Sequence, residues 1–582
     1  MVDGVAQPFS CAWNCHYCPS EPGQPRSYLH DEPAVRRANQ NAFDPVLQFT
    51  DRAATLAANG HPVDKIELLV LGGTWASYPH AYQEAFVRDL FYAANTFYAR
   101  GSARRSRLSL AEEQALNETA ASKIIGLTLE TRPDTIDAGE LGRLRRYGCT
   151  RVQLGLQHTD DAVLRKVNRG HGRKAAETAL RLLKDCCYKV DVHLMPNLPG
   201  ASPALDAAMF NAMCTHPDLQ ADQWKIYPCE VVPWTRIKTW FDEGSFVPYP
   251  DSELFEVILN AKAAVPPWVR LNRVVRDIPS QYILGGVDAP NMRQTLASHL
   301  LARGLACRCI RCREVGSGAG GGSGGGAAGG KPPGAEQRAA ANPSRAVLTQ
   351  RTYPASGGTE HFLSFESPDE TVIFGFVRLR LSRDPGSGVF PALKGAALIR
   401  ELHVYGQLVP VAAPAPRAAA PPAAAAAGAP SSSGAARRAA ARAAAAAAPA
   451  PRLSSSSAAS SAVSALAGGG GASPEAAPQH TGFGRALMDR AEEMAAAAGC
   501  ASCAVISGVG ARGYYRKLGY ELEHASGFMI KKIGLRKRAG ARFRAAVPTR
   551  LRSLLPLLPL IAALLLMMLH VLAGVTAGGM AD

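Results

Sequence analysis

The stretch Cys11-Ala12-Trp13-Asn14-Cys15-His16-Tyr17-Cys18 places three thiols in the spacing C-x-x-x-C-x-x-C. Three closely spaced thiolates can hold three irons of a 4Fe-4S cube, and the fourth iron then has no protein ligand at this site. An open iron can chelate a small molecule, which is the entry point to S-adenosylmethionine radical chemistry. Tyr17 is an aromatic of the kind that can lie beside the adenine. On the cysteines alone, a zinc knuckle or a pair of disulfides are the alternatives.

The segments that follow alternate short apolar runs with longer amphipathic stretches. Strands are expected at 66–71, 124–130, 151–156 and 189–195, and a helical pattern covers 175–184. Strands that alternate with helices predict a parallel sheet or a (β/α) barrel, in which the strand ends carry the chemistry.

Two of these strand ends carry candidate functional groups. Leu71-Gly72-Gly73-Thr74 follows the first strand, and exposed N–H groups in such a turn can hold the amino acid part of S-adenosylmethionine. An ordinary strand-to-helix turn is the alternative. The segment 128–134 puts Glu130, Arg132 and Asp134 at the next strand end, where charges either face a barrel mouth or form a salt-bridged loop.

The whole chain has 582 residues, a formal net charge of +16 and 13 cysteines. This length suits two or three domains, and a basic surface suits RNA or an anionic membrane face. An odd number of cysteines with metal-like spacing argues against a secreted disulfide scaffold. The first ten residues lack the apolar run of a secretory signal peptide, so the cysteines are expected in a reducing compartment.

The second half is divided by two low-complexity blocks. Residues 317–330 are almost all Gly, Ala and Ser, and 411–478 are dominated by Ala, Pro and Ser. We expect a flexible linker and a disordered insertion, respectively. Strands are expected at 360–365, 371–381, 397–409 and 503–508, with a helix at 485–498, which together suggest a small α+β domain interrupted by the insertion.

A second cysteine cluster, Cys307, Cys309 and Cys312, lies just before the linker. Three thiolates at this density suit zinc, which takes four ligands in a tetrahedron. The sequence leaves the fourth ligand open between Cys229 and a histidine, and free thiols on a mobile segment are the alternative.

The motif Gln479-His480-Thr481-Gly482-Phe483-Gly484-Arg485-Ala486 opens the helix of the second domain. Successive N–H groups at a helix start bind pyrophosphate, and N-acetyltransferase (GNAT) domains bind coenzyme A through this kind of turn. The run 514–520 then fits the closing helix and turn, where a tyrosine hydroxyl either contacts the thioester or caps the core.

The C-terminus carries an uncharged run of 20 residues, 554–573, preceded by seven basic residues between 536 and 552. This length spans a bilayer core, so we expect a transmembrane tail anchor with a basic cytosolic flank; a buried core helix is the alternative.

The chain resembles the catalytic subunit of Elongator and its single-subunit relatives, from Cys11 to about Lys532 outside the low-complexity blocks. The matching stretches are 71–74, 130–134, 168–171, 225–228, 265–268, 276–279, 401–406 and 505–510. The resemblance implies a partial TIM-like radical SAM barrel (1–300), a zinc-binding linker (301–316), a Gly/Ala-rich linker (317–344) and a GNAT domain (345–533, interrupted at 411–478). The basic flank (534–553) and the tail anchor (554–573) follow.

The resemblance also implies residue roles. Cys11, Cys15 and Cys18 would hold the 4Fe-4S cluster, and Gly72, Gly73 and Thr74 would lie against S-adenosylmethionine. Cys307, Cys309 and Cys312 resemble the family's zinc-binding segment. The acetyl-CoA site would be formed by Lys65 from the barrel side, Glu401, Leu402, His403, Val404, Phe483, Gly484, Arg485 and Tyr515, with Lys65 and Tyr515 as the catalytic candidates.

The implied activity is carboxymethylation of the wobble uridine of tRNA at carbon 5. A 5′-deoxyadenosyl radical would take hydrogen from the acetyl methyl of acetyl-CoA, the carbon radical would add to the uridine, and thioester hydrolysis would leave the carboxymethyl group. The expected partners are the tRNA anticodon loop, other Elongator subunits, a membrane and a second copy of the chain. The expected location is the cytoplasmic face of the mitochondrial or plastid outer membrane or the endoplasmic reticulum.

Two other functions stay open from the sequence. A lysine acetyltransferase acting on histones or other proteins would need only 345–533 and has no use for the iron–sulfur motif. A membrane-tethered RNA-binding scaffold whose catalysis has lapsed is the third possibility, because the family has a further N-terminal segment that contributes to tRNA binding, whereas ten residues precede Cys11 here.

Overall fold

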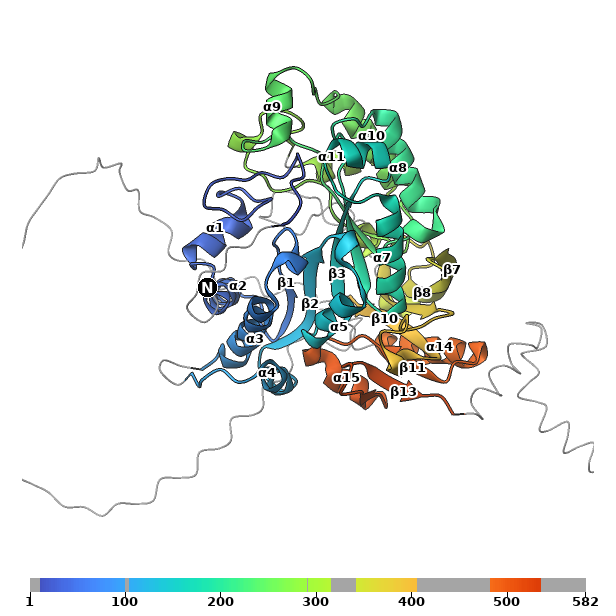
Figure 1. Cartoon of the computed structure of the whole chain (residues 1–582). Helices are drawn as coiled ribbons and strands as arrows, with labels where there is room; N and C mark the ends of the chain where they lie inside the picture. Colours follow the sequence, from blue (N-terminus) through green and yellow to red (C-terminus); the bar gives the residue numbers. More distant parts are fainter. Residues whose placement is uncertain (1–10, 100–103, 290, 316–341, 406–481, 535–582) are drawn as a thin grey trace, which may run out of the picture. The chain divides into compact units, whose positions relative to one another are not determined.

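A computed structural model describes residues 11–99, 104–289, 291–315, 342–405 and 482–534, all of which belong to one compact unit (Figure 1). The expected insertion at 411–478, the tail anchor at 554–573 and most of the linker and basic flank lie outside these residues. Within the described part of the chain, no helix has the length and apolar character needed to cross a membrane.

The first sheet has six strands in the order β1-β2-β3-β4-β5-β6, and every neighbouring pair is parallel. Sequential order with parallel pairing is the topology of a (β/α) barrel, here open between β1 and β6. The strands are β1 (Lys65–Leu69), β2 (Lys123–Thr131), β3 (Arg151–Gln157), β4 (Lys189–Leu194), β5 (Gln223–Ile226) and β6 (Arg270–Arg273).

Helices connect these strands and cover the outer face of the sheet. In α7 (Arg173–Asp185), the residues Ala176, Ala179, Leu180 and Leu183 are buried at helical spacing, so one face packs on the sheet. The other helices of this part are α1 (Pro33–Gln40), α2 (Pro45–Ala58), α3 (His80–Thr96), α4 (Leu110–Asn117), α5 (Ala138–Arg146), α6 (Asp161–Lys166), α8 (Pro203–Thr215), α9 (Arg236–Asp242), α10 (Asp251–Ala264), α11 (Met292–Ala302) and α12 (Ile310–Arg313).

The second sheet has seven strands in the order β12-β13-β11-β10-β9-β8-β7, antiparallel except for the central pair β10·β11. Helix α14 (Phe483–Ala498) packs on this sheet and α15 (Arg512–Lys517) follows β11. The strands are β7 (Val347–Ala355), β8 (Gly358–Glu366), β9 (Ile373–Leu381), β10 (Ala396–Val404), β11 (Ser502–Val505), β12 (Glu521–Leu522) and β13 (Met529–Lys532).

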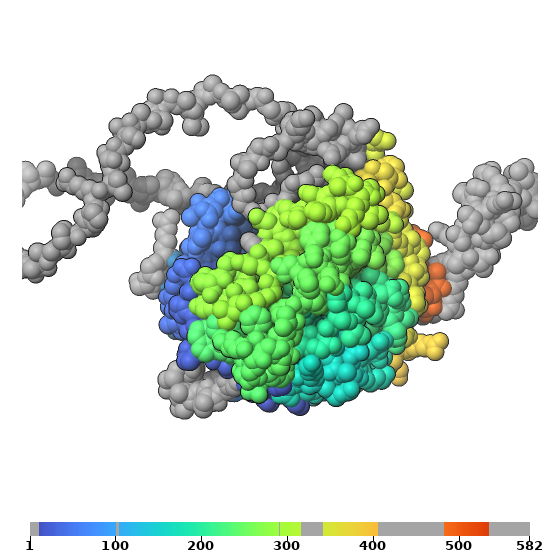
Figure 2. All heavy atoms as spheres, turned by 90° about the horizontal axis from the view of Figure 1, so that it is seen from above, coloured from blue at the N-terminus to red at the C-terminus, as the bar shows by residue number. Residues whose placement is uncertain are grey.

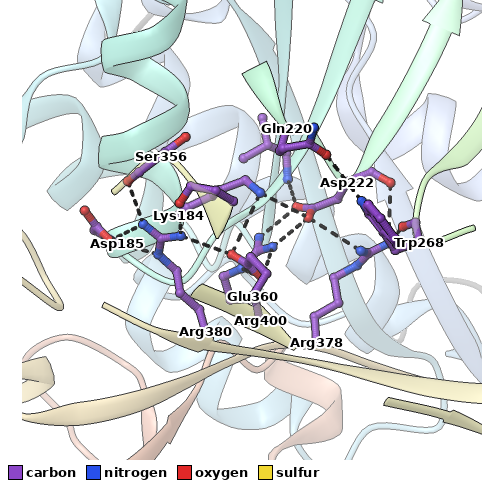
Figure 3. A network of polar contacts seen from close by, with 12 residues as sticks. Lys184, Asp185, Gln220, Asp222, Trp268, Ser356, Glu360, Arg378, Arg380 and Arg400 are labelled. Atoms are coloured by element: carbon purple, nitrogen blue, oxygen red, sulfur yellow. Dashed lines mark hydrogen bonds and ion pairs between the residues drawn. The ribbon is translucent and has the colours of Figure 1, made fainter. Parts of the chain in front are cut away.

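The two sheets meet through a fully buried network of charged side chains (Figure 3). From the second sheet, Arg400 donates to Asp222 and Glu360, and Arg380 donates to Asp185 at 2.6 and 2.8 Å. The ammonium of Lys184 lies 3.8 Å from both Asp222 and Glu360. Because buried charges are tolerated only when they are paired, this network requires both sheets to be in place.

The loop after β11 packs directly on the edge of the barrel. A Cβ atom added at Gly508 would lie 2.0 Å from the carbonyl oxygen of Ile125 in β2, so only glycine allows the contact. The contact at Gly508 and the ionic network are thus two separate places at which the second domain packs on the barrel.

Most of the expected strands and helices are confirmed. The four expected barrel strands correspond to β1–β4, the helix at 175–184 to α7, and the helix at 485–498 to α14. The strand expected at 397–409 corresponds to β10, which ends at Val404. Residues 406–409 lie outside the described residues. Strands β5, β6 and β7 were not anticipated, because β5 and β6 have four residues each and β7 contains a proline.

Candidate functional site

A cavity of about 650 Å³ opens at the carboxyl ends of the barrel strands. In open parallel sheets and barrels this end holds the ligand, since the strand-to-helix loops converge there. All three cysteines of the first cluster line it, together with the glycine turn Gly72, Gly73 and Thr74. Polar side chains of the barrel also face it, namely Glu130, Gln157, Arg169, His193, Lys225, Tyr227, Arg273 and Arg276.

Each sulfur of the triad has a polar neighbour. The hydroxyl of Thr74 donates to Cys11 at 3.4 Å and that of Ser27 donates to Cys18 at 3.0 Å. The guanidinium groups of Arg169 and Arg132 lie 3.6 and 3.8 Å from the sulfur of Cys15.

At Cys15 these contacts favour the thiolate form. The hydrogen bond from the Cys18 thiol, together with the charges of Arg169 and Arg132, outweighs the effect of burial and lowers the pKa of Cys15 to about 5. Thiolates that are surrounded by donors and cations are the ligands that an iron–sulfur cluster requires. The residues present therefore fit a cluster, and the alternative of a disulfide is not realised, since Cys15 and Cys18 are separate thiols.

The cysteine loop is fixed against the barrel by close packing. The ring of Trp13 lies under the guanidinium of Arg132, with 4.9 Å between the cation and the ring centroid. A Cβ added at Gly170, whose φ is +80°, would lie 2.3 Å from the same ring. Arg132 is itself paired with Asp134 at 2.9 Å. The segment 128–134 thus combines both expectations: Glu130 faces the cavity, whereas Arg132 and Asp134 form a salt bridge.

The floor of the cavity is a set of hydrogen-bonded polar side chains in the barrel interior. Gln153 accepts from Lys225 at 2.7 Å and contacts His193 at 3.2 Å, and His193 lies 3.6 Å from Glu130. Burial raises the pKa of Glu130 and lowers that of His193, because the surrounding protein disfavours charge on both. Both side chains are therefore favoured in their neutral forms.

A second candidate site lies where β10 and β11 separate. The two strands pair from Ala396 to Ile399. Beyond this point β10 stays paired with β9 on one side, but in the described part of the chain its other side has no paired strand along Glu401, Leu402, His403 and Val404. The start of α14 lies beside this segment, since a Cβ added at Gly484 would be 3.6 Å from Val404 and 2.8 Å from the hydroxyl of Tyr514. Two parallel strands that diverge beside a helix N-terminus leave backbone groups available for an extended ligand.

The remaining residues expected at this second site differ in exposure. Phe483 is buried and stacks on Phe365 with 4.4 Å between ring centroids, which fixes the start of α14. Arg485 is exposed and contacts Asp489 at 3.9 Å. Tyr515 is 8% exposed, and burial raises the pKa of its phenol, so the hydroxyl is a neutral donor.

Lys65 begins β1, at the barrel end that faces the second sheet. It pairs with Lys123 in β2, and the loop 508–510 packs on Lys123 and Ile124. Lys65 is thus near the junction of the two sheets, on the side opposite the cysteine-lined cavity.

Cys307, Cys309 and Cys312 form a third candidate centre, with ligand atoms that all lie within 4.8 Å of one another. Among the described residues no histidine, carboxylate or fourth cysteine joins this group at that distance. Cys229, which the sequence left open as a fourth ligand, instead packs in the apolar cluster that contains Cys15 and Tyr17.

Several residues of the first cavity were not assigned a role from the sequence. Arg169, Ser27, Lys225, His193 and Glu230 reach it from five separate segments. Arg169 and Lys225 lie in the stretches 168–171 and 225–228, which resemble the family, but the resemblance gave neither residue a role. Ser27, His193 and Glu230 lie outside the matching stretches. The parallel topology alone, which brings strand ends together, could have indicated Lys225 and His193.

Comparison with known protein families gives two matches. Residues 9–206 match the radical SAM superfamily, and residues 221–301 match the radical SAM C-terminal domain. Together these matches cover the barrel, including the cysteine triad and the strands that line the cavity.

Curated proteins similar to the chain match nearly its whole length. It is 34% identical to a tRNA uridine(34) acetyltransferase of Dehalococcoides mccartyi, over 91% of this chain and 96% of that protein. It is 32% identical to human Elongator complex protein 3, over 89% of this chain and 80% of the human protein.

A solved structure supports the fold as well. The structure of the archaeal Methanocaldococcus infernus Elp3 with an N-terminal deletion is similar with a TM-score of 0.66 and 33% identity, covering 85% of this chain and 97% of that one.

Proposed function

The chain belongs to the family of tRNA uridine(34) acetyltransferases that includes Elongator complex protein 3, and from this membership we propose how its two sites share the reaction. The enzyme is a radical SAM tRNA uridine(34) acetyltransferase. We propose that its product is a 5-carboxymethyl group on the wobble uridine. The observation that carries this proposal is that one compact unit contains both a cysteine-lined barrel cavity and a separated β10–β11 pair beside the start of α14.

Membership of the radical SAM family implies a 4Fe-4S cluster and S-adenosylmethionine. Cys11, Cys15 and Cys18 would hold the cluster, and the turn Gly72-Gly73-Thr74 would lie against S-adenosylmethionine. When bound, these groups supply a 5′-deoxyadenosyl radical able to remove hydrogen from an unactivated methyl group. The protein contributes the donors to the three sulfurs and a hydrogen-bonded polar floor of the barrel.

The acetyl-CoA site is proposed for the strand segment 401–404 and the residues 483–485 at the start of α14. Backbone groups of the separated strand would bind the extended pantetheine arm, and the first N–H groups of α14 would bind the pyrophosphate. Tyr515 would donate its hydroxyl to the thioester, because it is a buried, neutral phenol next to this segment. Lys65 would approach the same ligand from the barrel side.

The cysteine triad at 307, 309 and 312 is proposed to hold zinc. Three sulfurs within 4.8 Å suit one tetrahedral ion rather than a cluster. The centre lies at α12, which leads from the barrel toward the second sheet and contacts β6. Its role would be structural.

Partners and location remain proposals from the sequence. Relatives named as Elongator subunits suggest that other subunits of that complex, or a second copy of the chain, bind this protein. We propose that 554–573 anchors the chain to a membrane with the enzyme on the cytoplasmic face. Truncation before residue 554 in a fluorescent fusion should release the protein from membranes, and unchanged membrane association would contradict the anchor.

The function is tested by anaerobic reconstitution with iron and sulfide, followed by incubation with tRNA, S-adenosylmethionine and carbon-13-labelled acetyl-CoA. Nucleoside mass spectrometry should find labelled 5-carboxymethyluridine at the wobble position. The Cys15→Ser variant should form none. Acetylation of lysine in added histones by both proteins, without any labelled nucleoside, would instead support a protein acetyltransferase.

A further inference from the structure

A second cavity, of about 580 Å³, adjoins the cysteine-lined one and has no part in the reaction described above. The two cavities share a wall to which Pro33, Glu230, Arg273, Arg276, Asp277 and Ile278 contribute. On this face, the N-terminal segment (blue) lies beside the segment around residues 270–300 (green to yellow-green), as Figure 2 shows. The ion pair between Arg276 and Glu32, 2.7 Å apart, joins these two segments.

Four arginines line the second cavity, together with the acidic side chains of Glu230, Asp277 and Asp288. Arg293 of α11 and Arg311 of α12 line it in addition to Arg273 and Arg276 of the shared wall. Burial and the neighbouring charges of Arg270 and Arg293 lower the pKa of Arg311. Such a concentration of positive charge is typical of a site for phosphate.

Arg293 has an unused donor within this cationic group. Its Nη2 donates to the carbonyl of Leu271 at 2.9 Å, whereas its Nη1 is buried and has no hydrogen-bond partner among the described residues. Arg276, by contrast, is already bound to Glu32 and to the carbonyl of Ser27. The guanidinium of Arg293 is thus oriented by one contact and available for a second.

Glu230 in the shared wall is the other unusual group. The residue is only 6% exposed, yet neither carboxyl oxygen has a hydrogen-bond partner among the described residues. The backbone on both sides is fixed: the N–H of Cys229 donates to Pro196, and that of Val231 donates to Gly285, both at 2.8 Å. A buried carboxyl left without a partner in a fixed segment indicates a ligand, since such a group costs stability when it binds nothing.

The protonation of Glu230 narrows the chemistry of that ligand. Burial raises its pKa to about 8; Arg276 opposes this shift, and Asp288 and Glu32 add to it. Near neutral pH the group is therefore mainly a carboxylic acid, with one donor and one acceptor side by side. The Watson–Crick edge of uracil presents the complement, an N–H donor next to a carbonyl acceptor.

We propose that the second cavity receives the phosphate backbone beside the wobble nucleotide, with Arg293 binding a phosphate and Glu230 binding the Watson–Crick edge of the uracil at the wall of the cysteine-lined cavity. This inference rests on the proposed function and names the groups that bind its RNA substrate. A nucleotide placed in this way has its base in the reaction cavity and its phosphates outside it, as expected for enzymes that act on an extruded base.

The base contact is tested with the reconstituted protein under anaerobic conditions by fluorescence anisotropy. The probes are two labelled anticodon stem-loops that differ only in having uridine or an abasic site at the wobble position. The natural chain should prefer the uridine probe by about tenfold, the effect of one bidentate base contact. Glu230→Ala should abolish this preference, whereas Glu230→Gln should keep it, because the carboxamide also offers a donor and an acceptor. A preference that survives Glu230→Ala would overturn the proposal.

The competing ligand for Glu230 is S-adenosylmethionine, and a second measurement separates the two. Its binding, and its reductive cleavage without RNA, should be unchanged in both variants. Weaker binding or slower cleavage in Glu230→Ala would assign the carboxyl to S-adenosylmethionine instead. Neither measurement depends on tRNA modification. The proposed role of Glu230 can therefore be contradicted while labelled 5-carboxymethyluridine is still formed. Equally, the labelled nucleoside can fail to form while the binding results agree with that role.

The phosphate contact is tested with Arg293→Gln, and Arg303→Gln, at the residue that follows the same helix, is the matched control. Arg303 pairs with Glu256 on the surface, outside both cavities. Arg293→Gln should weaken both probes equally and reduce the slope of log affinity against log salt by about 0.7, the value for one phosphate contact on a single strand. Arg293→Lys should restore most of the slope. Equal affinities for Arg293→Gln and Arg303→Gln, in chains with the same melting temperature, would exclude this cavity as the backbone site.

Discussion

Asp222, which precedes β5 of the barrel, and Arg400, in β10 of the second sheet, face each other through two hydrogen bonds of 2.6 and 2.7 Å. Both side chains are fully buried. This bidentate pair is the centre of the network in Figure 3, in which a side chain from each sheet neutralises a charge on the other.

Asp222→Asn should destabilise the whole unit, because Arg400, Arg378 and Lys184 would each lose one of their two buried counter-charges. Removal of one partner from a buried pair costs about 3–5 kcal/mol. Urea denaturation followed by intrinsic fluorescence measures this loss. The exposed pair of Glu256 with Arg303 is the control, and Glu256→Gln should leave the midpoint unchanged. Similar midpoints for both variants would show that the network contributes little to stability.

The same pair predicts how stability depends on acid. Burial raises the pKa of Asp222, but Arg400 and Lys184 outweigh it and hold that pKa well below the usual 3.8. A carboxyl with a depressed folded-state pKa contributes stability that is fully present above the unfolded value and is lost as pH falls below it. The melting temperature of the natural chain should therefore fall steeply below about pH 4. The melting temperature of Asp222→Asn should fall less steeply over the same pH range. Parallel curves of melting temperature against pH would contradict this.

Loss of one cysteine of the first triad should abolish the cluster. After anaerobic reconstitution, Cys15→Ser should lack the broad visible absorption of iron–sulfur proteins and should not cleave S-adenosylmethionine, because three thiolates are needed to hold the cube. Cys500→Ser is the matched control, since Cys500 lies in the second domain at the end of α14. A cluster of normal intensity in Cys15→Ser would place the iron elsewhere.

The second triad should bind zinc independently of iron. Cys309 is fully buried between its two partners, so Cys309→Ser should lose roughly one equivalent of zinc per chain, measured by elemental analysis. The iron content should not change. We also expect a lower melting temperature, because a structural zinc stabilises the fold that supplies its ligands. Retention of zinc by Cys309→Ser would refute this assignment.

Tyr515 should act on acetyl-CoA and not on S-adenosylmethionine. Tyr515→Phe removes one buried hydroxyl and should slow tRNA-dependent consumption of acetyl-CoA by about 100-fold, as loss of a donor to a developing oxyanion does. The Michaelis constant for acetyl-CoA should change little. Tyr514→Phe is the neighbouring comparison. The Tyr514 hydroxyl lies near Gly484, so this variant should change the binding of acetyl-CoA. If Tyr515→Phe changes only the melting temperature, the hydroxyl serves the core.

The sequence was sufficient for those parts of the fold in which the signal is local. Strand β2 is rich in apolar residues, β3 and β4 have apolar residues at alternate positions, and α7 has buried residues at helical spacing. Strand β5 could not be recognised, because Gln223-Trp224-Lys225-Ile226 is short and half polar, although all four residues are buried. Its polar residues are satisfied by partners far away in the chain, which no local pattern reveals.

The candidate sites divide in the same way. The two cysteine triads and the glycine turn are local motifs, and each gathers at one place in the structure. The side chains that contact the cysteine sulfurs come from distant parts of the chain. Arg169 lies 154 positions from Cys15, and Arg132 lies 117 positions from it. Glu230 could not be singled out either, since the proposal for it rests on a buried carboxyl without a hydrogen-bond partner in the described part of the chain, which only the structure reveals.

The charged junction between the sheets bears on how this chain can be divided for study. A fragment beginning near residue 345 would retain Arg378, Arg380 and Arg400 but lose Asp185 and Asp222, which belong to the barrel. In such a fragment Glu360 and Glu401 would remain as partners of the three arginines, which leaves an excess of positive charge on what had been an interior face. The fragment would therefore be prone to bind nucleic acid and acidic proteins without selectivity. Acetyl transfer measured with an isolated second half would thus report on an altered molecule, and assignments of substrate are best made with both halves present.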